Sequence, residues 1–168
     1  MEMALPRQNM VTRSVLLNIV GIAFVYLAPT LSHFFAAPVY YLEPMRLMVV
    51  LGLVHTNRTN AVIMSLTLPA FSFFISSHPV FLKASLISVE LLVNVLVFVW
   101  LSKKLKEIAV AAFLSILVSK LFYYAVKAVL LSSALLGGSL VSTPIMVQVM
   151  MTLIFSAYVY QMLGKKKE

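Results

Sequence analysis

The sequence predicts an all-α polytopic membrane protein, with six transmembrane helices in one compact bundle and with both termini cytoplasmic. Hydrophobic residues make up 62% of the 168-residue chain and charged residues only 11%, whereas an average soluble domain has about 25% charged residues. Apolar runs recur that approach the roughly 20 residues needed to cross a bilayer. Arginine and lysine gather in alternate connections between these runs, which is typical of a membrane protein with a fixed orientation.

The apolar runs and the residues that interrupt them set the expected helices. The six helices cover residues 14–35, 39–55, 59–76, 79–101, 107–132 and 144–164, all within a single transmembrane domain of residues 1–168. The first run follows Arg7 and Arg13, as the core of a signal peptide would. At about 20 residues it exceeds a signal core of 7 to 15 residues, so we expect a retained span.

Three of the expected helices have a proline near their first turn, at Pro44, Pro79 and Pro144. Proline fits there because the first N–H groups of a helix have no intrahelical partner. If these three helix N-termini converge, their positive dipole ends would favour an anion; alternatively, the prolines only separate loops from helices. The glycine-rich segment 134–142 separates the last two helices.

The basic residues outside the spans predict the orientation of the chain. They are Arg7, Arg13, Arg58, Lys103, Lys104, Lys106, Lys165, Lys166 and Lys167. All precede the first helix, follow the last one, or lie in the second or fourth connection. The positive-inside rule therefore predicts cytoplasmic termini. The net charge of +8 is then a topology signal, and no nucleic-acid partner is expected.

Polar residues recur at helical spacing inside two of the expected spans. In the helix of residues 79–101, Lys83, Glu90 and Asn94 are separated by seven and four residues, so they share one face. A second polar stripe, in the helix of residues 107–132, consists of Lys120, Tyr123, Tyr124 and Lys127.

Glu90 and Lys120 are expected at the same depth in the bilayer. With a rise of about 1.5 Å per residue, Glu90 lies about 15 Å and Lys120 about 18 Å from the outer ends of their helices. An unpaired charge at the bilayer centre costs about 2.5 to 3.5 kcal/mol. We therefore predict an ion pair between Glu90 and Lys120, which either only fastens two helices or also forms the floor of a pocket.

The cations near the outer ends of the helices outnumber the acids. Lys83, Lys127 and Arg46 add to Lys120, whereas only Glu43 and Glu90 could neutralise them. Ionisable groups inside membrane proteins usually face a cavity or a pathway, so we predict an outward-opening cationic pocket. Alternatively, Lys83 and Lys127 extend to lipid headgroups. The candidate substrate-binding residues are Arg46, His78, Lys83, Glu90, Asn94, Lys120, Tyr123, Tyr124 and Lys127.

The motifs of common enzymes are missing from the sequence. It contains no glycine-rich phosphate loop, no HExxH, no GxSxG, no cysteine and no aspartate, and its three histidines are scattered over separate loops. We therefore expect no enzyme, no catalytic residue, no metal site and no cofactor. Any active transport would draw its energy from a partner or from an ion gradient.

The order of these features resembles the substrate-binding S components of energy-coupling factor (ECF) vitamin transporters. The segment SLTLPAFSFFISSHPVFLKASLISVELLVNVLVF, residues 65–98, is similar to the family pattern of a small-residue helix, a short outer turn ending in proline, and a helix with a mid-membrane glutamate. Pro79 and Glu90 match that pattern. The layout agrees over residues 14–164.

This resemblance implies a six-helix protein of a prokaryotic plasma membrane that binds a small-molecule micronutrient, such as a vitamin or its precursor. The site would lie near the outer face, covered by the first outer loop. Partners would be membrane lipid, a transmembrane coupling subunit and cytoplasmic ATPases. One departure is that many members carry an AxxxA motif on their first helix for docking the coupling subunit, whereas this chain has Gly21, Ala23 and Ala28 at other spacings.

Two other functions fit parts of the sequence. A non-transporting membrane scaffold, similar to the rod-shape-determining protein D family, would share the size, the helix count and an arginine-containing inner loop such as HTNRTN, residues 55–60. A carrier driven by an ion gradient would use Glu90 as a titrating group, although the sequence has no visible internal duplication of the kind such carriers often have.

Overall fold

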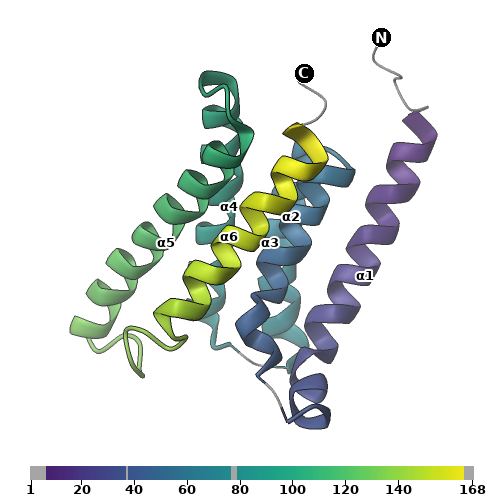
Figure 1. Ribbon diagram of the computed structural model, residues 1–168. Coiled ribbons are helices and arrows are strands. Elements are labelled where there is room, and N and C mark those ends of the chain that lie inside the picture. Colours follow the sequence, from purple (N-terminus) through teal and green to yellow (C-terminus); the bar gives the residue numbers. More distant parts are fainter. Residues whose placement is uncertain (1–6, 37, 77–78, 165–168) are drawn as a thin grey trace.

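The computed structural model describes residues 7–36, 38–76 and 79–164, and within these residues the chain is all-helical. Six α-helices run up and down the bundle (Figure 1). They are α1 (Arg7–Phe34), α2 (Pro44–His55), α3 (Arg58–Ser76), α4 (Phe81–Lys104), α5 (Ile108–Ser132) and α6 (Ile145–Leu163), with the short 3₁₀ helix η1 (Val39–Leu42) before α2. The prediction of an all-α chain is confirmed, and each of the six predicted spans overlaps one of these α-helices, with shifted boundaries.

Five of the six helices are long and apolar enough to cross a membrane: α1, α3, α4, α5 and α6. The exception is α2, whose 12 residues span about 18 Å. The expected continuous helix of residues 39–55 is wrong, because the chain breaks at Glu43, whose φ of 49° and ψ of 59° are left-handed. A residue that precedes proline is disfavoured in the α-region, which favours a helix start at Pro44, although Pro29 and Pro69 lie inside α1 and α3.

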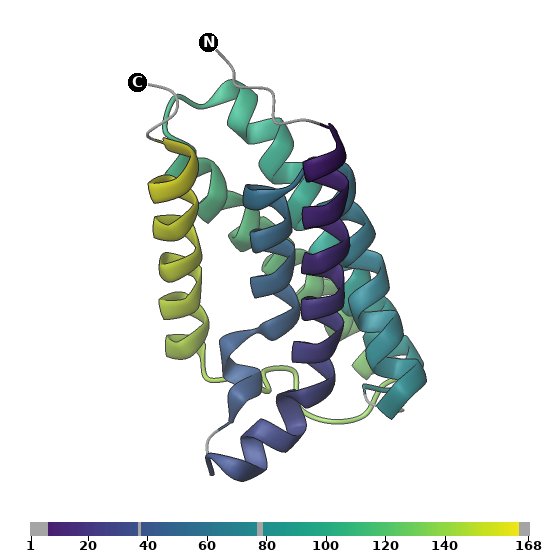
Figure 2. The same cartoon turned by 90° about the vertical axis from the view of Figure 1, so that its right-hand side faces the viewer.

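The two ends of the bundle differ in charge. The start of α1, the end of α6 and the α2–α3 and α4–α5 connections lie at one end (Figures 1 and 2). We call it the basic end, because it contains Arg13, Arg58, Lys103, Lys104 and Lys106. The opposite end contains η1 and the α5–α6 connection, and we call it the cavity end.

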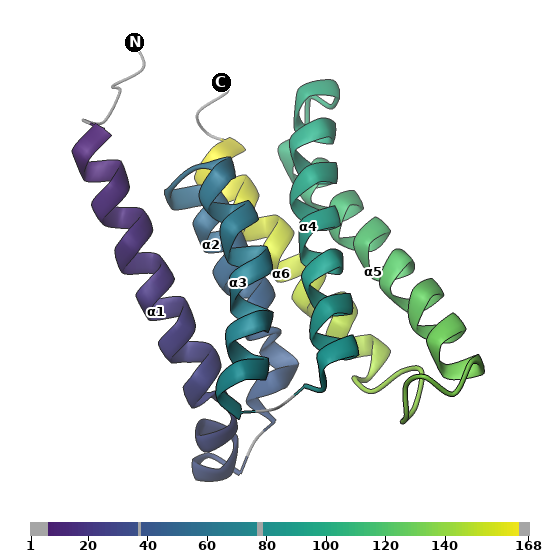
Figure 3. The same ribbon diagram turned by 180° about the vertical axis from the view of Figure 1, so that it is seen from behind.

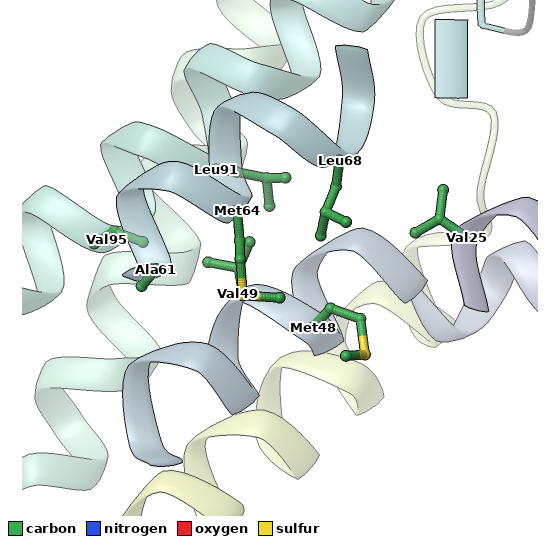
Figure 4. Close-up of a cluster of buried hydrophobic side chains, with 8 residues drawn as sticks. All are labelled: Val25, Met48, Val49, Ala61, Met64, Leu68, Leu91 and Val95. Carbon is green, nitrogen blue, oxygen red and sulfur yellow. The ribbon is translucent and has the colours of Figure 1, made fainter. Parts of the chain in front are cut away.

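The short helix α2 lies inside the bundle and contacts α1, α3, α4 and α6. Seen from behind, α1 and α5 lie at opposite edges of the molecule (Figure 3). The main apolar core joins α1, α2, α3 and α4, and Figure 4 shows its members, Val25, Met48, Val49, Ala61, Met64, Leu68, Leu91 and Val95. This core fixes the depth at which the first turn of α2 is held.

Small residues allow α4 and α5 to approach each other. Ala111, Ala112, Ser115 and Ser119 of α5 are buried, and small side chains at a helix interface let the two backbones come close in a membrane. Asn94 of α4 donates a hydrogen bond to Ser115 Oγ at 3.0 Å. The two helices that carry the polar stripes are therefore neighbours, as expected from their short connection.

Candidate ligand-binding cavity

A cavity of about 760 Å³ occupies the cavity end of the bundle. Helices α1, η1, α2, α4, α5 and α6 and the α5–α6 connection all contribute to its wall. Its volume lies within the range of about 300 to 1,000 Å³ that is usual for small-molecule sites. Seven of the nine predicted site residues line it: Arg46, Lys83, Glu90, Lys120, Tyr123, Tyr124 and Lys127.

Arg46 of α2 lies at the centre of a buried charge network. Only 3% of its surface is exposed. Its Nη2 donates a hydrogen bond to Glu90 Oε1, and its Nη1 lies 2.6 Å from Glu43 Oε2. The other oxygen of Glu43 accepts a hydrogen bond from Lys120 Nζ at 2.6 Å. Two carboxylates thus neutralise two cations, and we call these four residues the floor network.

The predicted ion pair between Glu90 and Lys120 is wrong. Glu90 pairs with Arg46, and Lys120 pairs with Glu43. The reason lies in α2: since this helix begins at Pro44 and not at Val39, Glu43 is its N-cap and Arg46 lies in its first turn. From there Arg46 reaches Glu90 of α4, and Glu43 reaches Lys120 of α5. The sequence prediction had placed both residues near the outer start of a helix of residues 39–55.

Gln148 of α6 extends the floor network, and the sequence analysis did not find it. Its Oε1 accepts a hydrogen bond from Lys120 Nζ at 3.3 Å, and its Nε2 donates to Tyr124 Oη at 2.6 Å and to the Thr143 carbonyl at 2.8 Å. One signal was available, because Gln148 follows Pro144 by four residues and is a strongly polar residue in an apolar helix.

Lys127 is held at the wall of the cavity by uncharged groups. Its Nζ donates to the Leu140 carbonyl at 2.8 Å and to Ser142 Oγ at 3.1 Å, and it lies 5.6 Å from the centre of the Tyr123 ring. Only 3% of its surface is exposed. The alternative prediction was that the Lys127 side chain extends to lipid headgroups. It is wrong, because the α5–α6 connection binds the ammonium group inside the bundle.

Lys83 also lines the cavity, from the first turn of α4. Its ammonium group forms no hydrogen bond or ion pair with any residue that the structure describes. The cavity lining thus contains four cations, Arg46, Lys83, Lys120 and Lys127, and two carboxylates, Glu43 and Glu90. Within the described part of the wall, two positive charges remain without a counter-ion.

One described residue of the predicted site, Asn94, does not contribute to this wall. Asn94 is buried between α4 and α5, where it donates to Ser115, and it is absent from the cavity lining. His78 lies outside the described residues. Among the described residues, no cluster of histidine, cysteine, aspartate or glutamate could hold a metal ion.

Comparisons of the chain with protein-family models, with curated proteins and with solved structures find no match.

Proposed function

We propose that the chain is a membrane-embedded substrate-binding protein, similar to the S components of ECF vitamin transporters. It binds a small, anionic micronutrient, such as a vitamin or its precursor, from outside a prokaryotic plasma membrane. The observation that carries this proposal is a cavity of about 760 Å³ whose wall holds two more cations than carboxylates. A protein that only locks helices together or acts as a scaffold would not need a cavity of this size and charge, whereas a protein that binds a small anion would.

The distribution of charge supports an outward-facing cavity. The cavity lies at the end of the bundle opposite Arg13, Arg58, Lys103, Lys104 and Lys106. The positive-inside rule assigns such a basic end to the cytoplasm, with both termini on that side. In this arrangement α2, although short, completes six membrane-inserted helices, since its first turn lies at the floor of the cavity and η1 leads from there to the outer surface.

Uptake through such a protein requires partner subunits. The sequence contains no ATPase motif, so the energy would come from cytoplasmic ATPases joined through a transmembrane coupling subunit. Two of the three small residues of α1 are not free to form a docking surface for that subunit. Ala28 is buried, and a side chain on Gly21 would approach Met64 Cε to 3.3 Å, so two of the three small residues already pack inside the bundle.

Ligand screening tests this proposal. The purified full-length chain, in detergent, would be screened by thermal shift and native mass spectrometry against vitamins and their precursors. One compound is expected to bind with one-to-one stoichiometry and to raise the melting temperature, since a ligand at 100 times its Kd stabilises by about 2.7 kcal/mol. Failure of every compound to bind, together with recovery of cell-wall or cytoskeletal proteins in pull-downs, would contradict the proposal and favour a scaffold.

A further inference from the structure

The charges that line the cavity are not spread evenly. The floor network is close to neutral, because Glu43 and Glu90 balance Arg46 and Lys120 through three ion pairs. The uncompensated charge therefore belongs to Lys83 and Lys127, which no described carboxylate neutralises. From these contacts we propose that the ligand carries two negative charges at one end, as a phosphate monoester or an adjacent dicarboxylate does, and that Lys83 and Lys127 bind that end. This inference rests on the proposed function.

Lys127 is positioned to donate a hydrogen bond to an anion. A lysine ammonium group has three N–H donors, and Leu140 and Ser142 accept two hydrogen bonds from it. The third donor remains for a ligand. The two accepting groups are neutral, so they orient the ammonium group without cancelling its charge, and a buried charge is costly until a counter-ion binds.

Lys83 supplies the second charge. It lies on α4, seven residues before Glu90, and so shares its helix face. Lys83 and Lys127 line the same cavity from two helices that pack against each other, α4 and α5. A single negative charge between them would leave one cation uncompensated, whereas a dianion neutralises both.

The rest of the wall fits the body of such a ligand. Ile87 and Leu91 of α4 and Val25 of α1 provide apolar surface, and Tyr123 provides an aromatic ring beside Lys127. The floor network has no net charge, so it neither attracts nor repels an uncharged body of the ligand. The wall therefore separates a doubly charged end of the ligand from a less polar body.

Four small compounds with a common ring test this inference directly. Binding of phenyl phosphate, phthalate, benzoate and benzyl alcohol to the full-length chain would be measured by isothermal titration calorimetry at pH 8, where the phosphate carries two charges. We expect at least one of the two dianions to bind about tenfold more tightly than benzoate, since a further charge-assisted hydrogen bond contributes about that much. The dianion that binds more tightly shows whether the doubly charged group of the ligand is a phosphate monoester or a dicarboxylate.

Matched substitutions locate the binding group. Lys83→Gln and Lys127→Gln should each reduce the preference for the dianion over benzoate by about tenfold, whereas Lys106→Gln makes the same change of charge at the basic end and should leave it unaltered. Lys83→Gln breaks no hydrogen bond or ion pair with a described residue, so it serves even if Lys127→Gln fails to fold.

Equal binding of dianions and benzoate, or no binding of either dianion, would overturn the inference. An unchanged preference in Lys83→Gln would do the same. A vitamin that binds without a doubly charged group would leave the proposed function standing while rejecting this inference, whereas failure of the whole vitamin screen concerns the proposed function itself.

Discussion

Glu90 and Arg46 form a buried ion pair in which each charge depends on the other. Taking either charge out of water costs several kcal/mol, and removal of one partner leaves the other uncompensated. Arg46 also keeps Glu43 as a partner, whereas the only described counter-ion of Glu90 is Arg46. The pair therefore connects α2 to α4 at the floor of the cavity.

Glu90→Gln is expected to destabilise the protein by roughly 3 kcal/mol, because Arg46 stays buried with one counter-ion fewer. Denaturant unfolding in mixed micelles measures this loss. In an Arg46→Met background the same substitution should cost at least about 1 kcal/mol less, whereas in a Lys120→Met background its cost should change little, since Lys120 pairs with Glu43. A coupling of Glu90 to Lys120 as large as that to Arg46 would contradict the observed pairing.

Asn94 is a buried polar residue that we expect to contribute to stability and not to ligand binding. We expect Asn94→Ala to lower the free energy of unfolding by about 1 to 3 kcal/mol, because Ser115 loses a buried hydrogen bond. Ligand affinity should stay the same, since Asn94 does not line the cavity. Measurement of Kd beside the melting temperature checks both statements, and a weakened Kd in a folded variant would return Asn94 to the site.

At the scale of the elements, α2 depends on a close approach to α3. A side chain at Gly52 would bring its Cβ to 2.6 Å from Met64 Sδ, and Met64 is fully buried. We expect Gly52→Ala to cost about 1 to 3 kcal/mol, as overpacking does in other cores, and to lower the melting temperature. Gly137→Ala is the matched control, because nothing lies within 4 Å of its added Cβ; equal losses would show that Gly52 is not a packing position.

The break before α2 also explains how far the sequence could predict the site. Hydropathy and proline placement predicted all six helices, because apolar length and helix starts are local properties. The start of α2 was wrong because the left-handed turn at Glu43 depends on Pro44 and on partners from distant helices. Glu43 and Gln148 contact Lys120 across 77 and 28 residues of chain, and no periodicity within one helix shows such contacts.

At the scale of the whole molecule, the cationic surplus was predictable and its arrangement was not. The sequence indicated that Lys83, Lys120, Lys127 and Arg46 outnumber the nearby acids, since this requires only their depth. Which cations are neutralised depends on how α2 lies between α1, α3, α4 and α6. Packing therefore decides that Lys120 is paired with Glu43, whereas Lys83 and Lys127 have no counter-ion among the described residues.

The proposed orientation of the whole chain can be tested with single cysteines, since the natural sequence has none. Ser139 in the α5–α6 connection and Lys106 in the α4–α5 connection are both exposed. In intact cells we expect a membrane-impermeant maleimide to label Ser139→Cys and not Lys106→Cys. After permeabilisation both should react. Labelling of Lys106→Cys in intact cells would reverse the orientation and turn the cavity toward the cytoplasm.

An outward-facing cavity that reaches as deep as Arg46 changes where the membrane voltage acts. Water in the cavity would carry the outside potential down to the floor network, so most of the voltage would fall across the remaining apolar layer below it. Moving one charge across the full potential involves about 2.3 kcal/mol per 100 mV. An anion that binds above the floor would cross little of that field, so its affinity would hardly depend on how strongly the cell is polarised.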